Sequence, residues 1–142
     1  MEIKDILGYL LNTSARFIKR RMDKELERYD MTTSQWAILK SLDTKSELTQ
    51  AQIAEELLAD RATIGTIIFK LIEKKYVEKK IDPADRRAYV VCLTPKAREI
   101  IKIIEKKAEE VSKQALEGLG EDEVKILYYS LNNIIHNLSG EE

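Results

Sequence analysis

The spacing of apolar residues changes at residue 76, and this change limits the folds open to the chain. Before it, apolar side chains recur every three or four positions, as they do on the buried face of a helix. After it, residues 76–81 and 88–93 read as two strands, separated by a segment that opens with the turn-forming pair Asp82-Pro83. The sequence therefore predicts a series of helices followed by a short β-hairpin.

Upstream of the hairpin, capping side chains mark where helices start. Thr32 with Gln35, and Thr49 with Gln52, fit the capping box S/T-x-x-E/Q. The predicted helices cover about 33–42, 49–58 and, with Asp60 as N-cap, 60–75. The inward face predicted for the short helix consists of Ile53, Ala54, Leu57 and Leu58.

Long amphipathic helices are predicted at both ends of the chain. Residues 3–30 carry a regular apolar stripe, and a helix of that length spans about 40 Å. A small core cannot cover such a stripe, so part of it is expected to pack against another chain. Thr94-Pro95 starts a further long helix that ends at Gly118, and the acids at 121–123 favour the start of a last one.

These elements together predict the fold class. The fold is expected to be mainly α with a small β-hairpin (α+β), a winged helix-turn-helix flanked by long dimerisation helices. The winged helix-turn-helix would occupy residues 31–94, and the dimerisation region residues 1–30 and 95–142.

The second helix of a helix-turn-helix lies in the major groove of DNA, whose width admits one α-helix. The outward side chains of helix 60–75 are therefore expected to approach DNA. They are Arg61, Thr63, Thr66, Phe69, Lys70 and Lys74, with Gly65 allowing close approach near the middle. The alternative for Thr63 and Thr66 is an ordinary solvated helix surface, and the alternative for Phe69 is a packed rather than an exposed side chain.

The total charge argues against nucleic acid, but its distribution does not. The net charge is −1 and the isoelectric point about 6.0, whereas nucleic-acid binders are usually basic. Residues 60–93 nevertheless hold eight basic and five acidic side chains, and residues 94–142 hold seven and ten. The two copies of this segment in a dimer would present a charge of about +6 toward a polyanion. The alternative is that these charges belong to an ordinary solvated surface.

The cysteine and histidine content excludes several kinds of site. One Cys, Cys92, and one His, His136, allow neither an intrachain disulfide nor a His/Cys zinc site, so no metal or cofactor is expected. Cys92 is interpreted as a small buried hydrophobe rather than a thiol sensor. The apolar runs are too short for a membrane span and no secretion signal opens the chain, so a cytoplasmic protein is expected.

The hairpin carries a resemblance to a known family. Asp82-Pro83-Ala84-Asp85-Arg86-Arg87, followed by Leu93-Thr94-Pro95-Lys96, resembles the wing and next helix of MarR-family transcription regulators, which often read D-x-x-D-R-R and then L-T-x-x-G. Length, helix order and Leu48-Thr49-Gln50 match as well, across the whole chain. The sequence departs from the family at Lys75, where Gly is usual, and at Gly65, Thr66 and Phe69, where polar or charged residues are typical.

The resemblance implies a sequence-specific regulator of transcription that binds double-stranded DNA. It implies a homodimeric repressor on a pseudo-palindromic operator, which a small aromatic or phenolic effector can release. In that family the second Arg of the wing enters the minor groove and the Asp two residues earlier holds it; here these are Arg87 and Asp85, with Arg86 beside them on the phosphates. A narrow minor groove concentrates negative potential, which suits a weakly hydrated guanidinium.

Other interpretations of these residues stay open. Asp85 and Arg87 could form a plain turn with a surface ion pair. The winged helix could bind a protein instead of an operator, with the long helices as a dimer rod. An enzyme is the weakest alternative, because one His, one Cys and no Gly-rich phosphate loop leave the usual catalytic combinations incomplete.

Overall fold

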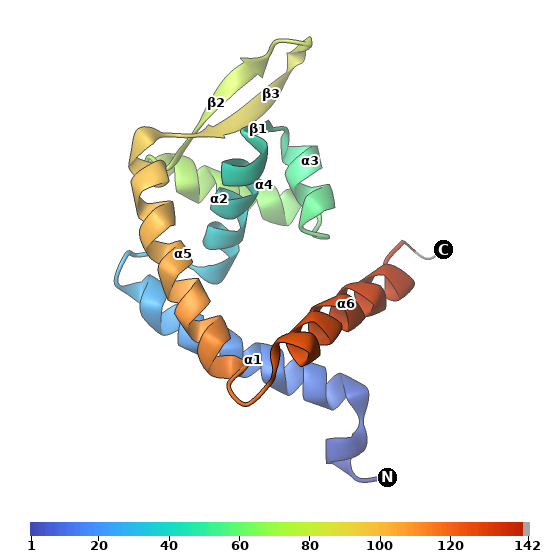
Figure 1. Ribbon diagram of the computed structural model, residues 1–142. Helices are drawn as coiled ribbons and strands as arrows, with labels where there is room; N and C mark the ends of the chain where they lie inside the picture. The colour runs from blue at the N-terminus through green and yellow to red at the C-terminus, as the bar shows by residue number, and fades with distance from the viewer. Residues whose placement is uncertain (141–142) are drawn as a thin grey trace.

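The computed structural model describes residues 1–140, and over that range the chain forms six α-helices, one short 3-10 helix and a small antiparallel sheet (Figure 1). The elements are, in chain order, η1 (Ile3–Asp5), α1 (Leu7–Glu27), α2 (Thr33–Lys45), β1 (Glu47–Leu48), α3 (Gln50–Glu56), α4 (Arg61–Glu73), β2 (Val77–Asp82), β3 (Asp85–Leu93), α5 (Pro95–Ala115) and α6 (Glu121–Leu138). The predicted fold class is confirmed. Within residues 1–140, no helix is long and apolar enough to cross a membrane.

The N-terminal helix is broken near its start, so the prediction of one helix over 3–30 is wrong. The backbone N–H of Asp5 donates to the carbonyl of Glu2 (3.0 Å) and closes a 3-10 turn, and the Asp5 carboxylate accepts from the Glu2 N–H (3.0 Å). Ile6 is then extended, with φ −86° and ψ 118°, and α1 starts after it. At the other end α1 stops at Glu27, and Asp30 adopts a positive φ of 51° that turns the chain toward α2.

Both predicted capping boxes are present. The backbone N–H of Gln35 donates to the Thr32 hydroxyl (3.1 Å), while the side-chain oxygen Oε1 of Gln35 accepts from the Thr32 N–H (3.2 Å). Thr49 and Gln52 repeat this reciprocal pair at 3.1 and 2.8 Å. These bonds satisfy backbone donors that a helix N-terminus otherwise leaves free, and they fix where α2 and α3 begin.

The turn between α3 and α4 differs from its prediction at Leu58. Leu58 does not join the inward face of α3, because the helix ends at Glu56 and Leu58 has a positive φ of 53° with its side chain exposed. The backbone N–H of Ala59 donates to the carbonyl of Ala54 (2.9 Å), which holds the tight turn. Asp60 then caps α4, as predicted.

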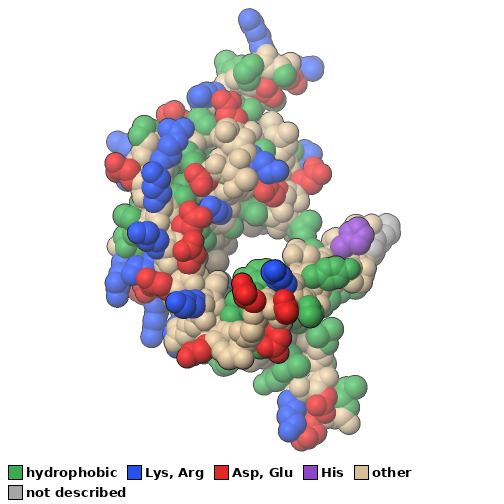
Figure 2. Space-filling view, in the orientation of Figure 1, with side chains coloured by type: hydrophobic (Ala, Val, Ile, Leu, Met, Phe, Trp, Pro, Cys, Tyr) green, Lys and Arg blue, Asp and Glu red, His purple; other side chains and the backbone are tan. Residues whose placement is uncertain are grey.

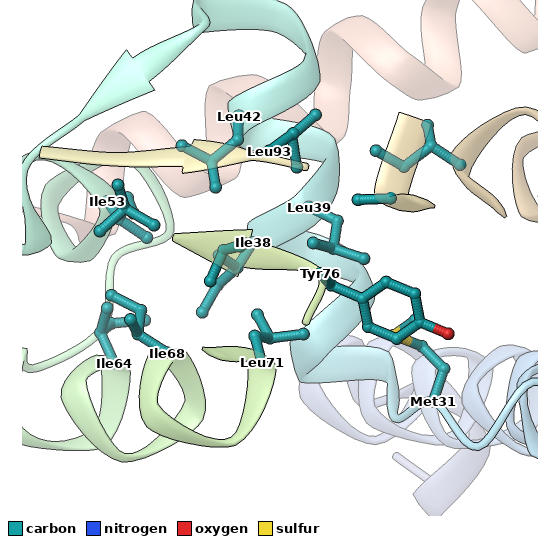
Figure 3. Packing of buried hydrophobic residues seen from close by; sticks show 14 of the residues in the cluster. Met31, Ile38, Leu39, Leu42, Ile53, Ile64, Ile68, Leu71, Tyr76 and Leu93 are labelled. Carbon is teal, nitrogen blue, oxygen red and sulfur yellow. The ribbon is translucent and has the colours of Figure 1, made fainter. Parts of the chain in front are cut away.

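A single core lies among α2, α3, α4, the sheet and the first half of α5 (Figure 3). Its fully buried side chains come from every one of these elements: Ile38, Leu39, Leu42, Ile53, Ile64, Ile68, Leu71, Val77, Val91, Ile101 and Ile104. From α1, Met22 and Leu26 join the same cluster. The core therefore fixes α4 against the sheet from which the hairpin projects.

The hairpin is longer than predicted and its turn is shorter. Instead of a loop over 82–87, only Pro83 and Ala84 form the turn, so Asp85, Arg86 and Arg87 belong to β3. The antiparallel register pairs Ile81 with Tyr89 and shifts at Asp82. A third strand that the sequence did not predict, β1, pairs with the other edge of β3, so the strand order is β1-β3-β2.

The last helix stands apart from the rest. Figure 1 shows α6 projecting away from the bundle after the turn at Gly118, which has φ +93°. None of its residues is buried. Figure 2 shows open space between α6 and the body that contains the core. Its apolar side chains therefore do not join the core, and those of Ile126, Tyr128, Tyr129, Ile135 and Leu138 are exposed.

Candidate nucleic-acid interface

Helix α4 has a buried face and an exposed face. Ile64, Ile68 and Leu71 point into the core with 2% or less of their surface exposed. At 3.6 residues per turn, the positions on the opposite side are 62, 66, 69 and 73. All four are exposed, and Phe69 keeps 62% of its surface accessible. The outward positions predicted for Thr66 and Phe69 are confirmed, and Ala62 is an outward position that the sequence reasoning missed.

The start of α4 is held by one carboxylate. Asp60 accepts from the N–H of Thr63 and from its hydroxyl, both at 2.8 Å. These two bonds lower the pKa of Asp60, because they favour its ionised form. Thr63 is exposed, as predicted, but its hydroxyl hydrogen is already used in this cap.

Gly65 faces the neighbouring helix, not the solvent. A Cβ at this position would lie 2.7 Å from Nε2 of Gln50 on α3. That amide donates to the carbonyl of Arg61 (2.8 Å), so it crosses between the two helices over Gly65. The close approach expected at Gly65 therefore exists, but it is to Gln50. From the sequence, Gln50 had no predicted role at the site beyond its place in Leu48-Thr49-Gln50, since a glutamine at the first position of a helix carries no distinctive signal.

Lys74 is not an outward residue of α4, and this prediction is corrected. Its ammonium donates to the backbone carbonyl of Asp30 and to Oε1 of Gln35 (3.0 Å), and it pairs with the Asp30 carboxylate at 3.7 Å. Gln35 is 4% exposed. The long, flexible Lys stem lets the charge reach these acceptors at the α1–α2 turn. Lys74 thus ties the end of α4 to the start of α2.

Lys75 ends α4 in the left-handed conformation, with φ +65°. Most residues adopt this conformation at a cost, and glycine adopts it readily. The position is the one where Gly is usual in the MarR family. Thr94 stabilises the junction, since its hydroxyl donates to the carbonyl of Lys75 (2.8 Å).

The wing carries an Asp that restrains an Arg. Oδ1 of Asp85 accepts from the backbone N–H of Arg87 (3.0 Å) and from its Nε (3.4 Å). The Arg87 side chain is still 92% exposed. An exposed pair of this kind contributes little to stability, but it limits the rotamers of the guanidinium while leaving its two terminal nitrogens free to bind.

Cationic side chains surround the exposed face of α4 and the wing. Arg61, Lys70 and Arg86 are all exposed, and none of these side chains makes a hydrogen bond or ion pair within residues 1–140. On the wing, the Lys79 ammonium lies 5.8 Å from the centre of the Tyr89 ring. Figure 2 shows Lys and Arg side chains at the wing tip and along α5. The arrangement can attract a polyanion to α4 and the wing.

A short helix, a tight turn, a second helix with one free face and a projecting hairpin define a winged helix-turn-helix protein. The structure agrees closely with solved proteins of this class. BpsR from Bordetella bronchiseptica matches 100% of this chain and 99% of its own with a TM-score of 0.88 and 22% identity; its structure concerns regulation of DNA binding by 6-hydroxynicotinic acid. A variant of E. coli MarR in complex with operator DNA matches 91% of this chain and 93% of its own, with a TM-score of 0.84 and 24% identity.

Sequence comparisons agree with the fold. The family model described as MarR family matches residues 29–88. The HTH-type transcriptional regulator YwoH of Bacillus subtilis is 32% identical over 78% of this chain and 74% of its own length. The chain therefore belongs to the MarR family of transcriptional regulators, a non-enzymatic family.

Proposed function

We propose that the protein is a cytoplasmic, homodimeric repressor that binds a pseudo-palindromic operator and has no enzymatic activity. The observation that supports this most strongly is the wing, where Asp85 restrains an exposed Arg87 beside a helix whose outer face is free. In this proposal α4 lies in the major groove and Arg87 enters the adjacent minor groove. Residues 31–94 bind DNA, and residues 1–30 with 95–142 dimerise.

The contacts assigned to DNA differ in kind. Arg61, Lys70 and Arg86 are free cations that suit phosphates, which position the protein without reading sequence. Asp85 acts on DNA through Arg87. Gly65 and Lys74 contribute indirectly, since Gly65 accommodates Gln50 and Lys74 is held at the α1–α2 turn.

Dimerisation is supported by apolar surface that the chain does not cover itself. Exposed apolar side chains lie on α6, on the N-terminal half of α1 and in the segment before α1: Ile3, Ile6, Leu7, Leu10, Phe17, Ile126, Tyr128, Tyr129, Ile135 and Leu138. Large exposed apolar surface marks an association site. A two-fold dimer would place two winged helices on the two halves of one operator.

The decisive experiment compares the two wing arginines. Arg87→Ala should weaken binding to the specific operator by about tenfold to a hundredfold and leave non-specific DNA binding nearly unchanged. Arg86→Ala is the matched control, because the phosphate that Arg86 neutralises is present in every DNA sequence, so both kinds of binding should weaken alike. Fluorescence anisotropy on the operator and on random DNA measures both. Operator binding that does not respond to Arg87→Ala would contradict the proposal.

Release by a small aromatic or phenolic effector is supported by a groove of about 430 Å³ between α1 and α5. Its lining combines apolar side chains with cations: Phe17, Ile18, Val111, Arg20, Arg21 and Lys24. This combination suits an aromatic ring that carries an acidic group. Titrating aromatic acids and phenols into the protein–operator complex tests this proposal. We expect the parent protein to dissociate from the operator, and we expect Arg21→Ala or Lys24→Ala to prevent that dissociation.

A protein-binding winged helix is the second candidate, and the exposed Phe69 on α4 favours it. The salt dependence of binding separates the two candidates. DNA affinity should fall steeply as salt rises, because neutralised phosphates release counterions. A flat response, with no operator selected, would favour the protein partner.

A further inference from the structure

The exposed face of α4 is unusually apolar for a surface that meets DNA. Over its first two and a half turns the positions opposite the core hold Ala62, Thr66 and Phe69. Phe69 keeps 62% of its surface accessible. Contact of such a ring with water is unfavourable, so a ligand that buries the ring gains binding free energy.

The same three side chains offer little hydrogen bonding to base edges. Ala62 and Phe69 have no polar side-chain atom, and the Thr66 hydroxyl donates to the carbonyl of Ala62 (3.2 Å). That bond uses the only hydrogen that the Thr66 hydroxyl can donate, so the free parts of this side chain are its methyl group and the acceptor side of its oxygen. Reading guanine or adenine in the major groove usually takes a bidentate Arg, Lys, Asn or Gln, and none of these occupies the three positions.

One base does present an apolar group in the major groove. Thymine carries a C5-methyl there, and Ala, Phe and the methyl of Thr are the side chains that contact it. The charges around the stripe fit the same ligand, because Arg61 precedes it and Lys70 flanks it, placing cations toward the phosphates. Glu73 ends the stripe with a negative charge, so the base-reading part of α4 lies before it.

We propose that α4 reads thymine methyl groups through Ala62, Thr66 and Phe69, so that the operator half-site holds neighbouring thymines beneath this helix. The inference rests on the proposed function, since it names the bases which the same helix reads. Phe69 supplies the largest contact, and its ring becomes buried against the methyl groups. Arg61 and Lys70 hold the phosphates and contribute affinity without base preference.

The experiment removes single methyl groups from the DNA. The full-length protein first selects its site from random duplexes, and each thymidine of that site is then replaced by deoxyuridine, which lacks only the C5-methyl. Anisotropy should show about a threefold to fivefold loss of affinity for each contacted methyl, the effect of one buried carbon. Replacement outside the α4 contact should have little effect on binding.

Two variants on the same helix assign the loss to residues. Phe69→Ala should weaken binding and abolish the uracil penalty at the thymines beneath Phe69, because the partner of the methyl group is gone. It should keep the melting temperature of the parent, since the ring is exposed. Lys70→Ala is the control. It should bind all DNA more weakly, but its affinity should still fall by the full amount when uracil replaces thymine. This double comparison also separates methyl contacts from effects of uracil on DNA shape.

The outcomes separate the inference from the function on which it rests. A protein that selects an operator but binds its uracil form equally well overturns the thymine reading alone. A uracil penalty that persists unchanged in Phe69→Ala also overturns it. A protein that selects no DNA overturns both proposals together.

Discussion

Helices α4 and α6 both carry a regular apolar stripe, but only α4 buries its stripe within the chain. Ile64, Ile68 and Leu71 of α4 are in the core. The stripe of α6, which consists of Val124, Leu127, Leu131 and Ile134, is only half-buried, and Ile126 and Tyr129 on its other faces are exposed. Burial of apolar surface is the main favourable contribution to folding and to association. The difference indicates that α4 belongs to a unit stabilised by its own core, and it supports the proposed pairing of α6 with a second chain.

The largest expected effect tests the buried side of this comparison. Ile38→Ala removes a fully buried side chain at the centre of the core, which should lower the free energy of unfolding by about 2–5 kcal/mol. Ile126→Ala on α6 is the control, with little effect on unfolding of the winged helix itself. Denaturant unfolding followed by Trp36 fluorescence measures both. Equal losses would mean that the two helices belong to one core.

A charge on α6 should affect association. Tyr129 is 69% exposed, and Tyr129→Asp should weaken dimerisation by about 2 kcal/mol or more if its ring is buried between chains. The secondary structure of the winged helix should be retained. Sedimentation over a range of concentrations measures the change. A parent protein that sediments as a folded monomer at micromolar concentration would contradict the comparison.

Two lysines of α4 should differ in how they respond to salt. Lys70→Met removes a free cation and should reduce the slope of log affinity against log salt by about one. Lys74→Met should leave that slope unchanged, because the Lys74 ammonium is occupied by Asp30 and Gln35. Its affinity should fall because α4 is no longer held in position, and Lys74→Arg should restore part of it. A lower slope for Lys74→Met would show that Lys74 contacts DNA.

The smallest effect concerns pH and the Asp60 cap. The pKa of Asp60 lies below its ordinary value of 3.8 in the folded protein, so its ionised form stabilises α4. This stability is complete well above pH 3.8 and is lost as the pH falls through the lower, folded pKa. Asp60→Asn keeps a capping oxygen but does not titrate. The parent should therefore lose stability in acid more steeply than Asp60→Asn, as thermal melts between about pH 2 and pH 6 would show.

The sequence predicted best where the signals were local. The capping bonds of Thr32, Thr49 and Asp60 involve atoms only three residues apart, so their pattern determines them nearly alone. The Asp85–Arg87 contact is equally local. The predicted ends of the elements were wrong where local signals were weak, as at Ile6. They were also wrong where strand pairing extended β3 into the expected loop, as at Asp85.

The errors at the candidate site came from contacts between distant segments. Helical spacing alone placed Lys74 on the outer face, because it cannot show that Asp30 and Gln35, some 40 residues earlier, lie within reach of the ammonium. The same holds for Gly65, whose neighbour Gln50 comes from another helix. Strand β1 was missed because two residues carry no periodicity, and only pairing with β3 makes them a strand.

The sequence by itself determined the order of helices, their capped starts, the hairpin and the Asp and Arg of the wing, since each depends on backbone geometry and side-chain bonds a few residues apart. The tertiary structure alone decided which cations of α4 remain free, which side chains oppose its buried face, and which apolar stripes stay uncovered. These depend on the packing of segments that the chain brings together only when its core forms, and burial changes the role of a residue without changing its identity.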